Sequence, residues 1–294
     1  MGSSRVISRI CFGCEPLGGM DWGKIDVADI ASAISRALEF GVNFFDTADV
    51  YGLGMSESRL SEILGHKRHE VVIATKGGMS WDDTQISGRA KITKDCSPKY
   101  LRCAVEASLR RLRIDSIPVY FIHWPDPNTE IGSTIECLSR LRDEGKIGQI
   151  GCSNFDSAMV RSASEISEIS FIQLPINLLD KDLDPVIQGI AIEKNIGIVA
   201  YNVLARGLLT GNYDANCRFP QNDRRARLPL FHGEAYRNAL TKVADISTAA
   251  TADNLTCAQY AISKVLDLPG VVSVILGIKN RLQIEENCTI LSTR

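Results

Sequence analysis

Short apolar runs alternate with amphipathic stretches along almost the whole chain. After the first apolar run, Val27, Ile30, Ala31, Ile34 and Leu38 recur at helical spacing, and similar stretches follow the later runs. The apolar runs predict strands at residues 7–12, 42–45, 71–75, 118–122, 149–152, 171–173, 197–201 and 272–276. Because strands that alternate with helices form a parallel sheet with right-handed crossovers, this pattern predicts an α/β fold.

The residues at the ends of these stretches support the predicted helices. Asp26 and Asp156 occupy N-cap positions, while Ser97-Pro98 and Asp184-Pro185 pair a capping residue with proline in the first helical turn. Glycine follows the last apolar position of three helices, at Gly41, Gly65 and Gly145. A last helix is expected from about residue 281.

The number of units favours a closed barrel over an open sheet. Some eight strand–helix units span the 294 residues without a linker or a low-complexity segment, which suits a single (β/α)8 TIM barrel domain over 1–294. An open sheet that bound a dinucleotide would normally carry G-x-G-x-x-G after its first strand. Residues 13–19 are Gly-Cys-Glu-Pro-Leu-Gly-Gly, which does not match.

Two connections, 77–96 and 205–233, are longer than the usual limit of ~12–15 residues for a structureless loop. Both follow predicted strands, so both are expected on the face where barrels carry their active sites. We expect them to act as lids or as walls of a substrate site. The second connection contains five arginines, for which a solvated charged loop is favoured over an anion site: Arg206, Arg218, Arg224, Arg225 and Arg227.

Composition excludes several classes of function. With 45% hydrophobic and 23% charged residues and a net charge of -2, the chain lacks the basic excess of a nucleic-acid-binding protein. No apolar run reaches the ~18 residues of a membrane span, and no leader is visible, so a cytoplasmic protein is expected. The nine cysteines are scattered, and Cys11 and Cys14 form a lone CxxC without a second pair. Buried, reduced thiols and no metal site are therefore expected.

Ionisable residues follow three of the predicted strands. Asp46, Lys76 and His123 each come directly after an apolar run, and Tyr51 lies five residues beyond Asp46. Since strand ends converge on one mouth of a closed barrel, these four side chains are expected to meet. A nearby ammonium favours phenolate, so Lys76 is expected to lower the pKa of Tyr51 toward useful acidity. Asp46 could hold Lys76, and a neutral His123 could donate a hydrogen bond to a substrate oxygen. Such a group suits proton transfer coupled to a change at a carbonyl.

These motifs resemble those of the aldo-keto reductase family. The stretch Gly41-Val-Asn-Phe-Phe-Asp46-Thr-Ala-Asp-Val-Tyr51-Gly52 is similar to that family's signature, and the resemblance then runs along almost the whole chain. It continues through Ala74-Thr75-Lys76, Phe121-Ile122-His123-Trp124-Pro125-Asp126 and Gly145-Lys146-Ile147-Gly148-Gln149-Ile150-Gly151-Cys152-Ser153-Asn154-Phe155. The family has the barrel fold and binds NADP(H) without the glycine fingerprint.

The resemblance implies a role for each matching residue. Tyr51 would be the general acid in reduction and the base in oxidation, Lys76 and Asp46 would tune it, and His123 would orient the carbonyl. Ser153, Asn154 and Gln173 would bind the nicotinamide carboxamide, and Tyr201 would stack on its ring. The rest of the NADP(H) site would comprise Leu204, Gly207 and Leu209 along the pyrophosphate, and Gly277, Lys279, Gln283, Glu286 and Asn287 at the adenosine end.

Several positions depart from the family pattern. Cys14 stands where threonine is common, Ile176 where tyrosine is frequent, and Asn202-Val203 replaces the usual Ser-Pro. In some branches an arginine that grips the 2′-phosphate stands where this chain has Gln283. Lys279 then remains as the charged partner that favours NADP(H) over NAD(H).

The resemblance implies an NADP(H)-dependent oxidoreductase acting on an aldehyde or ketone. The residues expected to line the substrate site are Met20, Trp22, Val50, Trp81 and Trp124. Together with Asp21 and the arginines, they favour a sugar-like carbonyl compound as the substrate. The main alternative is an NADPH-binding regulatory subunit with little turnover; a phosphate-binding isomerase or an aldolase using Lys76 is less favoured. A monomer or a weak homo-oligomer is expected, with a small molecule as the only partner.

Overall fold

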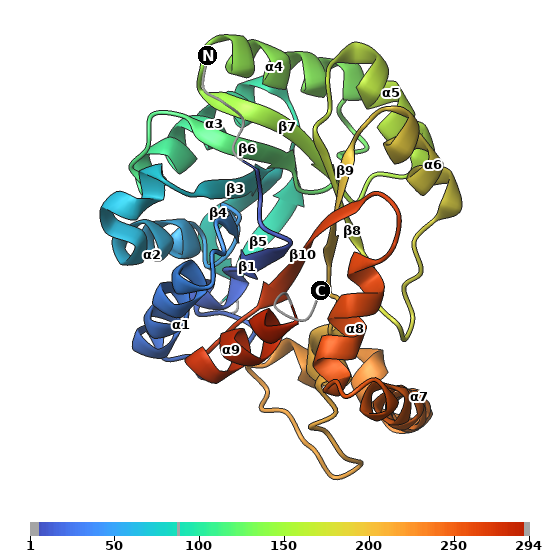
Figure 1. Cartoon of the computed structure of the whole chain (residues 1–294). Coiled ribbons are helices and arrows are strands. Elements are labelled where there is room, and N and C mark those ends of the chain that lie inside the picture. The colour runs from blue at the N-terminus through green and yellow to red at the C-terminus, as the bar shows by residue number, and fades with distance from the viewer. Residues whose placement is uncertain (1–5, 87–88, 291–294) are drawn as a thin grey trace.

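Eight parallel strands close a barrel within residues 6–86 and 89–290, which are the residues that this computed structural model describes (Figure 1). Around the barrel, each strand is hydrogen-bonded to its neighbours in the order β1-β10-β9-β8-β7-β6-β3-β2. Their bounds are β1 Ile10–Gly13, β2 Phe44–Asp46, β3 Val72–Gly77, β6 Ile117–Ile122, β7 Ile147–Ser153, β8 Phe171–Pro175, β9 Gly197–Tyr201 and β10 Val271–Gly277. The predicted barrel is confirmed, while the ends of the predicted 1–294 domain lie outside the described residues.

Helices surround the strands, and most of them follow the strand that the sequence pattern assigned to them (Figure 1). They are α1 Val27–Glu39, α2 Met55–Leu64, α3 Pro98–Leu112, α4 Ile131–Asp143, α5 Ser157–Ile166, α6 Pro185–Glu193, α7 Gly233–Ala252, α8 Cys257–Leu266 and α9 Arg281–Thr289. None of the helices in the described part of the chain is both long and apolar enough to cross a membrane.

The predicted caps form as expected. The Asp26 side chain accepts hydrogen bonds from Ala28 N and Asp29 N, which satisfies donors that the first turn of α1 leaves free. Asp156, Ser97 and Asp184 cap α5, α3 and α6 in the same way. Helices α7 and α8 lie between residues 233 and 266, where the hydrophobic pattern described above predicts no helix. Thr256 and Gln259 form a capping box at the start of α8, a signal that was present in the sequence.

The two faces of each strand contribute to different parts of the core. Phe44 joins Val72, Val119 and Val199 in the barrel interior, whereas the next residue, Phe45, packs outward with its ring centre 5.8 Å from that of Phe12. The barrel is filled by side chains and is a packed core, so the chemistry must take place at its mouth.

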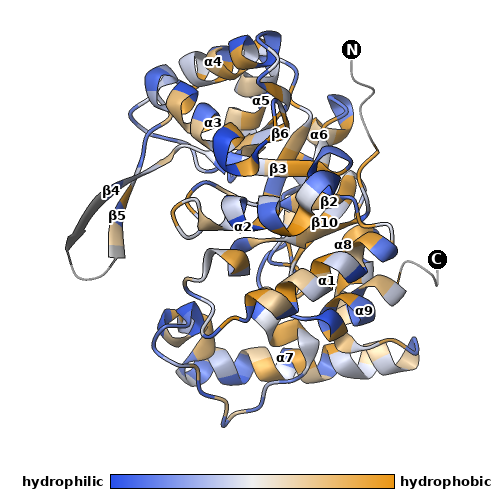
Figure 2. Ribbon diagram, turned by 90° about the vertical axis from the view of Figure 1, so that its left-hand side faces the viewer, coloured by the Kyte–Doolittle hydropathy of each residue, from blue (hydrophilic) through white to orange (hydrophobic). Residues whose placement is uncertain are grey.

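The connection at 77–96 is a β-hairpin and not an irregular loop. Strand β4 (Met79–Ile86) pairs with β5 (Arg89–Lys94) in antiparallel fashion, and the Tyr100 hydroxyl donates to Met79 O at 3.0 Å near its base. The hairpin stands apart from the barrel and its helices (Figure 2). Residues 79–94 lack a sustained apolar alternation, so the sequence pattern does not predict these two strands.

The connection at 205–233 also contains regular structure. It contains three 3-10 helices, η3 (Ala205–Thr210), η4 (Arg224–Arg227) and η5 (Pro229–Phe231). The rings of Phe219 and Phe231 meet edge to face with their centres 5.1 Å apart, within a second hydrophobic cluster that includes residues of α7. The long loop is therefore anchored to α7 by its own small core.

Candidate active site

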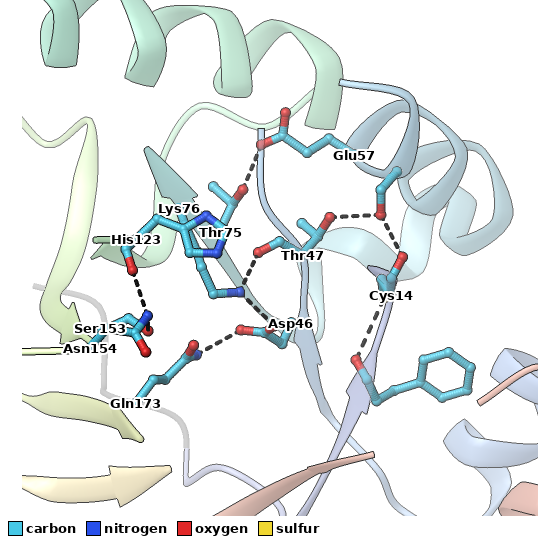
Figure 3. A network of polar contacts seen from close by, with 12 residues as sticks. Cys14, Asp46, Thr47, Glu57, Thr75, Lys76, His123, Ser153, Asn154 and Gln173 are labelled. Carbon is cyan, nitrogen blue, oxygen red and sulfur yellow. Dashed lines mark hydrogen bonds and ion pairs between the residues drawn. The ribbon is translucent and has the colours of Figure 1, made fainter. Parts of the chain in front are cut away.

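The ends of β2 and β3 hold a buried ion pair. Lys76 Nζ donates to Asp46 Oδ2 at 2.6 Å and to Thr47 O at 2.8 Å, and Gln173 Nε2 donates to Asp46 Oδ1 at 2.7 Å (Figure 3). Lys76 is 2% exposed and Asp46 3%. Burying either charge alone would be costly, so each side chain fixes the position of the other.

Tyr51 and His123 lie beside this pair. Lys76 Nζ is 5.1 Å from the centre of the Tyr51 ring, and the His123 ring meets the Tyr51 ring edge to face at a centre distance of 5.7 Å. The structure thus brings together all four predicted catalytic side chains. They come from three neighbouring strand ends, as the closed barrel requires.

The pKa of Tyr51 departs from the prediction. Burial raises it well above the usual value for tyrosine, the carboxylates of Glu15 and Asp46 add to the rise, and Arg224 opposes it. The expected lowering by Lys76 does not dominate, because Asp46 pairs with the ammonium and itself disfavours phenolate. Tyr51 is therefore protonated at neutral pH, the state that a proton donor needs.

His123 is neutral at the same pH. Burial lowers its pKa well below the usual value for histidine, and the positive charge of Lys76 lowers it further. Its Nδ1 is buried and has no hydrogen-bond partner among the described residues. A neutral imidazole can donate one hydrogen bond without a charge that would compete with Lys76.

Hydrogen bonds of several hydroxyl groups connect the site to helix α2. Thr75, which precedes Lys76, donates to Glu57 Oε1 at 2.6 Å, and the hydroxyls of Thr47 and Ser56 are 2.8 Å apart (Figure 3). These contacts tie α2 to the ends of β2 and β3. Ser56 and Glu57 come four and five residues after Gly52, the last residue of the signature stretch, and the sequence alone assigns them no role.

Asp49 is a second titratable group that the sequence analysis did not assign. It is 1% exposed, and neither of its carboxyl oxygens has a hydrogen-bond partner within the described part of the chain. Burial raises its pKa well above the usual value, and the neighbouring carboxylate of Glu57 raises it further. This shift is in the direction that favours the protonated form of Asp49.

The predicted nicotinamide residues form one connected group. Asn154 Nδ2 donates to Ser153 Oγ at 3.0 Å and to His123 O at 2.9 Å, and the Tyr201 hydroxyl donates to Asn154 Oδ1 at 2.6 Å. Asn154 has a φ of 62°, a left-handed conformation that asparagine tolerates. The amides and hydroxyls of this group match the donors and acceptors of a carboxamide, and they adjoin the Tyr51 site. On this chemistry, the residues fit a nicotinamide ring.

The predicted pyrophosphate segment lies on η3. Arg206 and Gly207 have φ values of 56° and 99°, and this kink divides the 3-10 helix. The N–H groups of Gly207 and Leu209 both donate to Leu204 O. Those two donors are already used within the segment, so a phosphate there would have to be bound by other groups.

The predicted adenosine end lies beyond β10. Lys279 N donates to Gln283 Oε1 at 2.8 Å, and Lys279 Nζ donates to Trp22 O at 2.7 Å. Gly277 is exposed, with no atom within 4 Å of where a Cβ would lie. On α9, Glu286 is exposed and Asn287 is buried. Lys279 and Gln283 are therefore in direct contact. The hydrogen bond from Lys279 to Trp22 also joins a residue predicted to bind the cofactor to one predicted to line the substrate site.

The predicted substrate walls fall into two groups. Trp81 is on β4 and Trp124 lies below Lys94 of β5, whose Nζ is 5.3 Å from the Trp124 ring centre. Trp22 lies on the other side with Lys279, while Met20 is 51% exposed. Val50 is half-buried next to Tyr51. The residues predicted as walls therefore come from several segments: the hairpin, the loop after β6, the loop after β1 and the position before Tyr51.

Three arginines of the 205–233 connection form ion pairs, and the prediction of a solvated charged loop is wrong only for Arg225, whose side chain is 12% exposed. Two of the pairs join this loop to the loop after β1, which the sequence analysis did not foresee because the partners are some 200 residues apart. The pairs are Arg224–Glu15 at 2.7 Å, Arg227–Asp21 at 2.6 Å and Arg225–Asp223 at 2.6 Å.

All nine cysteines are free, and seven are buried. The structure groups no set of His, Cys, Asp or Glu side chains that could hold a metal ion among the described residues.

Comparisons with known proteins agree with this geometry. A model of the aldo/keto reductase family matches residues 9–294. The chain is similar to aldo-keto reductase YhdN of Bacillus subtilis, with 32% identity over 95% of this chain and 83% of the relative. It is 29% identical to the NADH-specific methylglyoxal reductase of Escherichia coli, over 99% of this chain and 92% of that protein.

Solved structures show the same architecture. The glycerol dehydrogenase AKR11B4 of Gluconobacter oxydans superimposes with a TM-score of 0.87 and 31% identity, covering 99% of this chain and 90% of the other. An aldo/keto reductase of Klebsiella pneumoniae in complex with NADP and acetate shares the fold, with a TM-score of 0.71 and 21% identity over 97% and 86% of the two chains. With the barrel, the four side chains at its mouth and a match over nearly its full length, this chain belongs to the aldo/keto reductase family of oxidoreductase enzymes.

Proposed function

We propose that this chain interconverts an aldehyde or ketone and its alcohol with NADP(H), using Tyr51 as the general acid and base. The observation that carries the proposal is the packing of Tyr51 between the Lys76–Asp46 pair and neutral His123 at the mouth of the barrel. The proposal rests on side chains that act on a carbonyl oxygen and its proton, and it needs no metal or nucleophile.

Each of these residues has a separate task. Tyr51 donates its hydroxyl proton to the carbonyl oxygen in reduction and recovers a proton from the alcohol in oxidation. His123 donates a hydrogen bond that orients the same oxygen. Lys76, held by Asp46, stabilises the phenolate that forms when Tyr51 gives up its proton. NADP(H), when bound, supplies or accepts the hydride.

Reduction is the direction that the resting protonation state favours. Because the pKa of Tyr51 is raised by its surroundings, the hydroxyl carries its proton at neutral pH. Alcohol oxidation needs the phenolate, so its rate rises as the pH increases, while reduction loses its proton donor at alkaline pH.

The cofactor is held by residues from opposite ends of the site. Ser153, Asn154 and Gln173 bind the nicotinamide carboxamide and Tyr201 stacks on its ring, while Lys279 provides a positive charge for the 2′-phosphate. One yeast relative, aldo-keto reductase yakc of Schizosaccharomyces pombe, carries NADP(+) in its name and is 30% identical. The Escherichia coli relative is named NADH-specific, so both cofactors belong in the test.

The substrate is a small polar carbonyl compound. The names of two relatives, glycerol dehydrogenase and methylglyoxal reductase, refer to three-carbon oxygenated molecules. The paired charges beside the mouth are compatible with substrates of that kind and with the sugar-like compounds that the sequence suggests.

Replacing Tyr51 tests the mechanism. In Tyr51→Phe we expect kcat for carbonyl reduction to fall by about 10²–10⁴-fold, since the proton donor is lost, while the Kd for NADPH measured by fluorescence stays within about twofold. Tyr260→Phe, on α8 away from the mouth, is the matched control and should retain activity. Undiminished reduction by Tyr51→Phe would overturn the mechanism, and a wild-type chain that binds NADPH without turnover would support a regulatory role.

A further inference from the structure

A cavity of about 430 Å³ lies between the 205–233 connection and the start of α7. The connection lies beside α7 and below the barrel in both views (Figure 1, Figure 2). The volume falls within the range of about 300–1,000 Å³ that small-molecule sites occupy in proteins. None of the residues that line this cavity belongs to the proposed carbonyl or cofactor site. It is therefore a separate candidate for a binding site.

Three aromatic side chains form the apolar wall of the cavity: Phe219, Phe231 and Tyr236. The ring centres of Phe219 and Phe231 are 5.1 Å apart, and those of Phe231 and Tyr236 are 6.1 Å apart. Phe231 and Tyr236 are each 6% exposed, and the Tyr236 hydroxyl donates to Asp214 O at 2.8 Å. These contacts hold the rings in place, so the wall is preformed for a planar apolar group.

The charged side chains that line the cavity are both arginines, Arg218 and Arg237, and no aspartate or glutamate lines it. Arg218 Nη1 donates to Ala215 O at 3.2 Å and to Cys217 O at 2.9 Å. A guanidinium has five N–H donors, so these two bonds leave donors of Arg218 for a ligand. Neither arginine forms an ion pair within the part of the chain that the structure describes. The cavity therefore has a net positive charge beside its apolar wall.

Arg218 differs in this respect from other arginines of the same connection. Arg224, Arg225 and Arg227 are each paired with a carboxylate of the protein. Arg218 is exposed, as the prediction of a solvated loop expects, but it borders a cavity and not open solvent alone. A guanidinium binds a carboxylate through two parallel N–H bonds, and it does so more strongly beside apolar surface than in water. Unpaired guanidiniums next to an aromatic wall therefore favour an anion with a planar apolar body.

We infer that this cavity binds a small aromatic carboxylate. The planar body packs on Phe219, Phe231 and Tyr236, while the carboxylate accepts hydrogen bonds from Arg218 and Arg237. A neutral compound of the same shape gives the guanidiniums no charge to pair with, and a small anion without a ring leaves the aromatic wall uncovered. The inference does not depend on the proposed function, because it concerns binding and not turnover.

Cys217 provides a reporter inside the cavity. Its thiol is free and partly exposed and lines the cavity, whereas the free thiol of Cys103 is exposed on α3, outside it. The rate at which iodoacetamide alkylates each thiol can be followed by mass spectrometry of the peptides. With 2-naphthoate at ten times its Kd, we expect alkylation of Cys217 to slow about tenfold, because the cavity is then free for only about a tenth of the time. Alkylation of Cys103 should not change.

Two comparison ligands separate the contribution of charge from that of shape. 2-Naphthamide has the same planar body without the charge, and acetate has the charge without the planar body. We expect the Kd of each, measured by protection of Cys217, to be at least about tenfold higher than that of 2-naphthoate. Protection by 2-naphthamide or by acetate that equals protection by 2-naphthoate would overturn the inference.

Substitution of the two arginines completes the test. Arg218→Gln and Arg237→Gln should each raise the Kd for 2-naphthoate about tenfold, since each removes a charged donor. Arg140→Gln on the exposed side of α4 is the matched control and should leave the Kd unchanged. Alkylation rates with and without ligand are compared within each variant, because residue 218 adjoins Cys217, and thermal unfolding shows that each variant is folded.

If Arg218→Gln fails to fold, Arg237→Gln on α7 decides the matter alone. Absence of protection in the wild-type chain at 2-naphthoate concentrations up to about 10 mM would overturn the inference. Protection that both variants retain unchanged would overturn it as well. Neither result bears on carbonyl reduction at the barrel mouth.

Discussion

At the scale of single residues, the site is surrounded by buried ionisable groups whose protonation the fold determines. Lys76 and Asp46 form a buried ion pair, whereas burial shifts the pKa values of His123 and Asp49 in the direction that favours their neutral forms. Asp49 is 1% exposed, and both of its carboxyl oxygens lack hydrogen-bond partners among the described residues. It therefore makes the stability of the protein depend on pH.

Asp49→Asn should stabilise the protein at neutral pH. A carboxyl whose pKa is raised on folding stabilises the fold fully below its ordinary pKa of about 4, and this contribution is lost as the pH rises through the raised value. The asparagine variant cannot ionise, so its advantage in the free energy of unfolding should be largest at pH 7–8 and shrink toward pH 4. Urea unfolding at several pH values measures this, with Asp245→Asn on the exposed side of α7 as the control. A constant difference across the pH range would show that ionisation of Asp49 is not the cause.

At the scale of elements, the turn η1 (Glu15–Gly18) and the loop that carries Tyr51 act as one unit. Gly52 has a φ of +62° and lies against Gly18, and Ser56 Oγ donates to Cys14 O at 2.7 Å. Glycine is required at 52 for two reasons, the left-handed backbone and the lack of space for a Cβ. Any change that separates these backbones also displaces Tyr51.

Gly52→Ala should cost more stability than a glycine substitution that adds backbone strain alone. Gly41→Ala is the matched control, because Gly41 has a φ of +77° but no atom within 4 Å of the new Cβ. We expect a loss of about 1 kcal/mol for Gly41→Ala and about 2–4 kcal/mol for Gly52→Ala, together with a fall in kcat. Chemical denaturation and steady-state kinetics measure both effects. Equal losses in the two variants would contradict the close packing.

At the scale of the whole molecule, the barrel brings together strand ends that are far apart in the chain. The proposed cofactor site draws on β7, β8 and β9, the segment after β9 and the end of β10, so a bound cofactor links much of the barrel. Ligand binding to the native state stabilises it, by about 2.7 kcal/mol at a hundredfold excess over Kd. The cofactor preference should therefore appear in thermal unfolding.

NADPH should raise the midpoint of thermal unfolding more than NADH at equal concentration. Lys279→Met should weaken NADPH binding by about 10–100-fold and leave NADH binding nearly unchanged, because only NADPH has a phosphate for the ammonium to contact. Lys264→Met on the exposed side of α8 is the control. If Lys279→Met weakened both cofactors equally, Lys279 would not be the 2′-phosphate contact.

Much of the fold and part of the site follow from the sequence alone. The alternation of apolar runs and helical spacing predicted the barrel, since each unit is a local pattern, and caps such as Asp26 and Asp184 were visible in the same way. Asp46, Lys76 and His123 were predicted to meet because a closed parallel barrel brings its strand ends to one mouth.

Only the tertiary structure decided the electrostatics of that mouth. Burial and neighbouring carboxylates, which depend on every element packed around Tyr51, reversed the expected lowering of its pKa. The pairing of Glu15 with Arg224 depends on the path of a long loop across the barrel mouth, and no periodic pattern in the sequence specifies that path. The sequence determined which groups carry the chemistry, because strand ends are local features. The structure determined the directions of the pKa shifts and the ion pairs around the mouth, because desolvation and long-range pairing arise only when distant segments pack together.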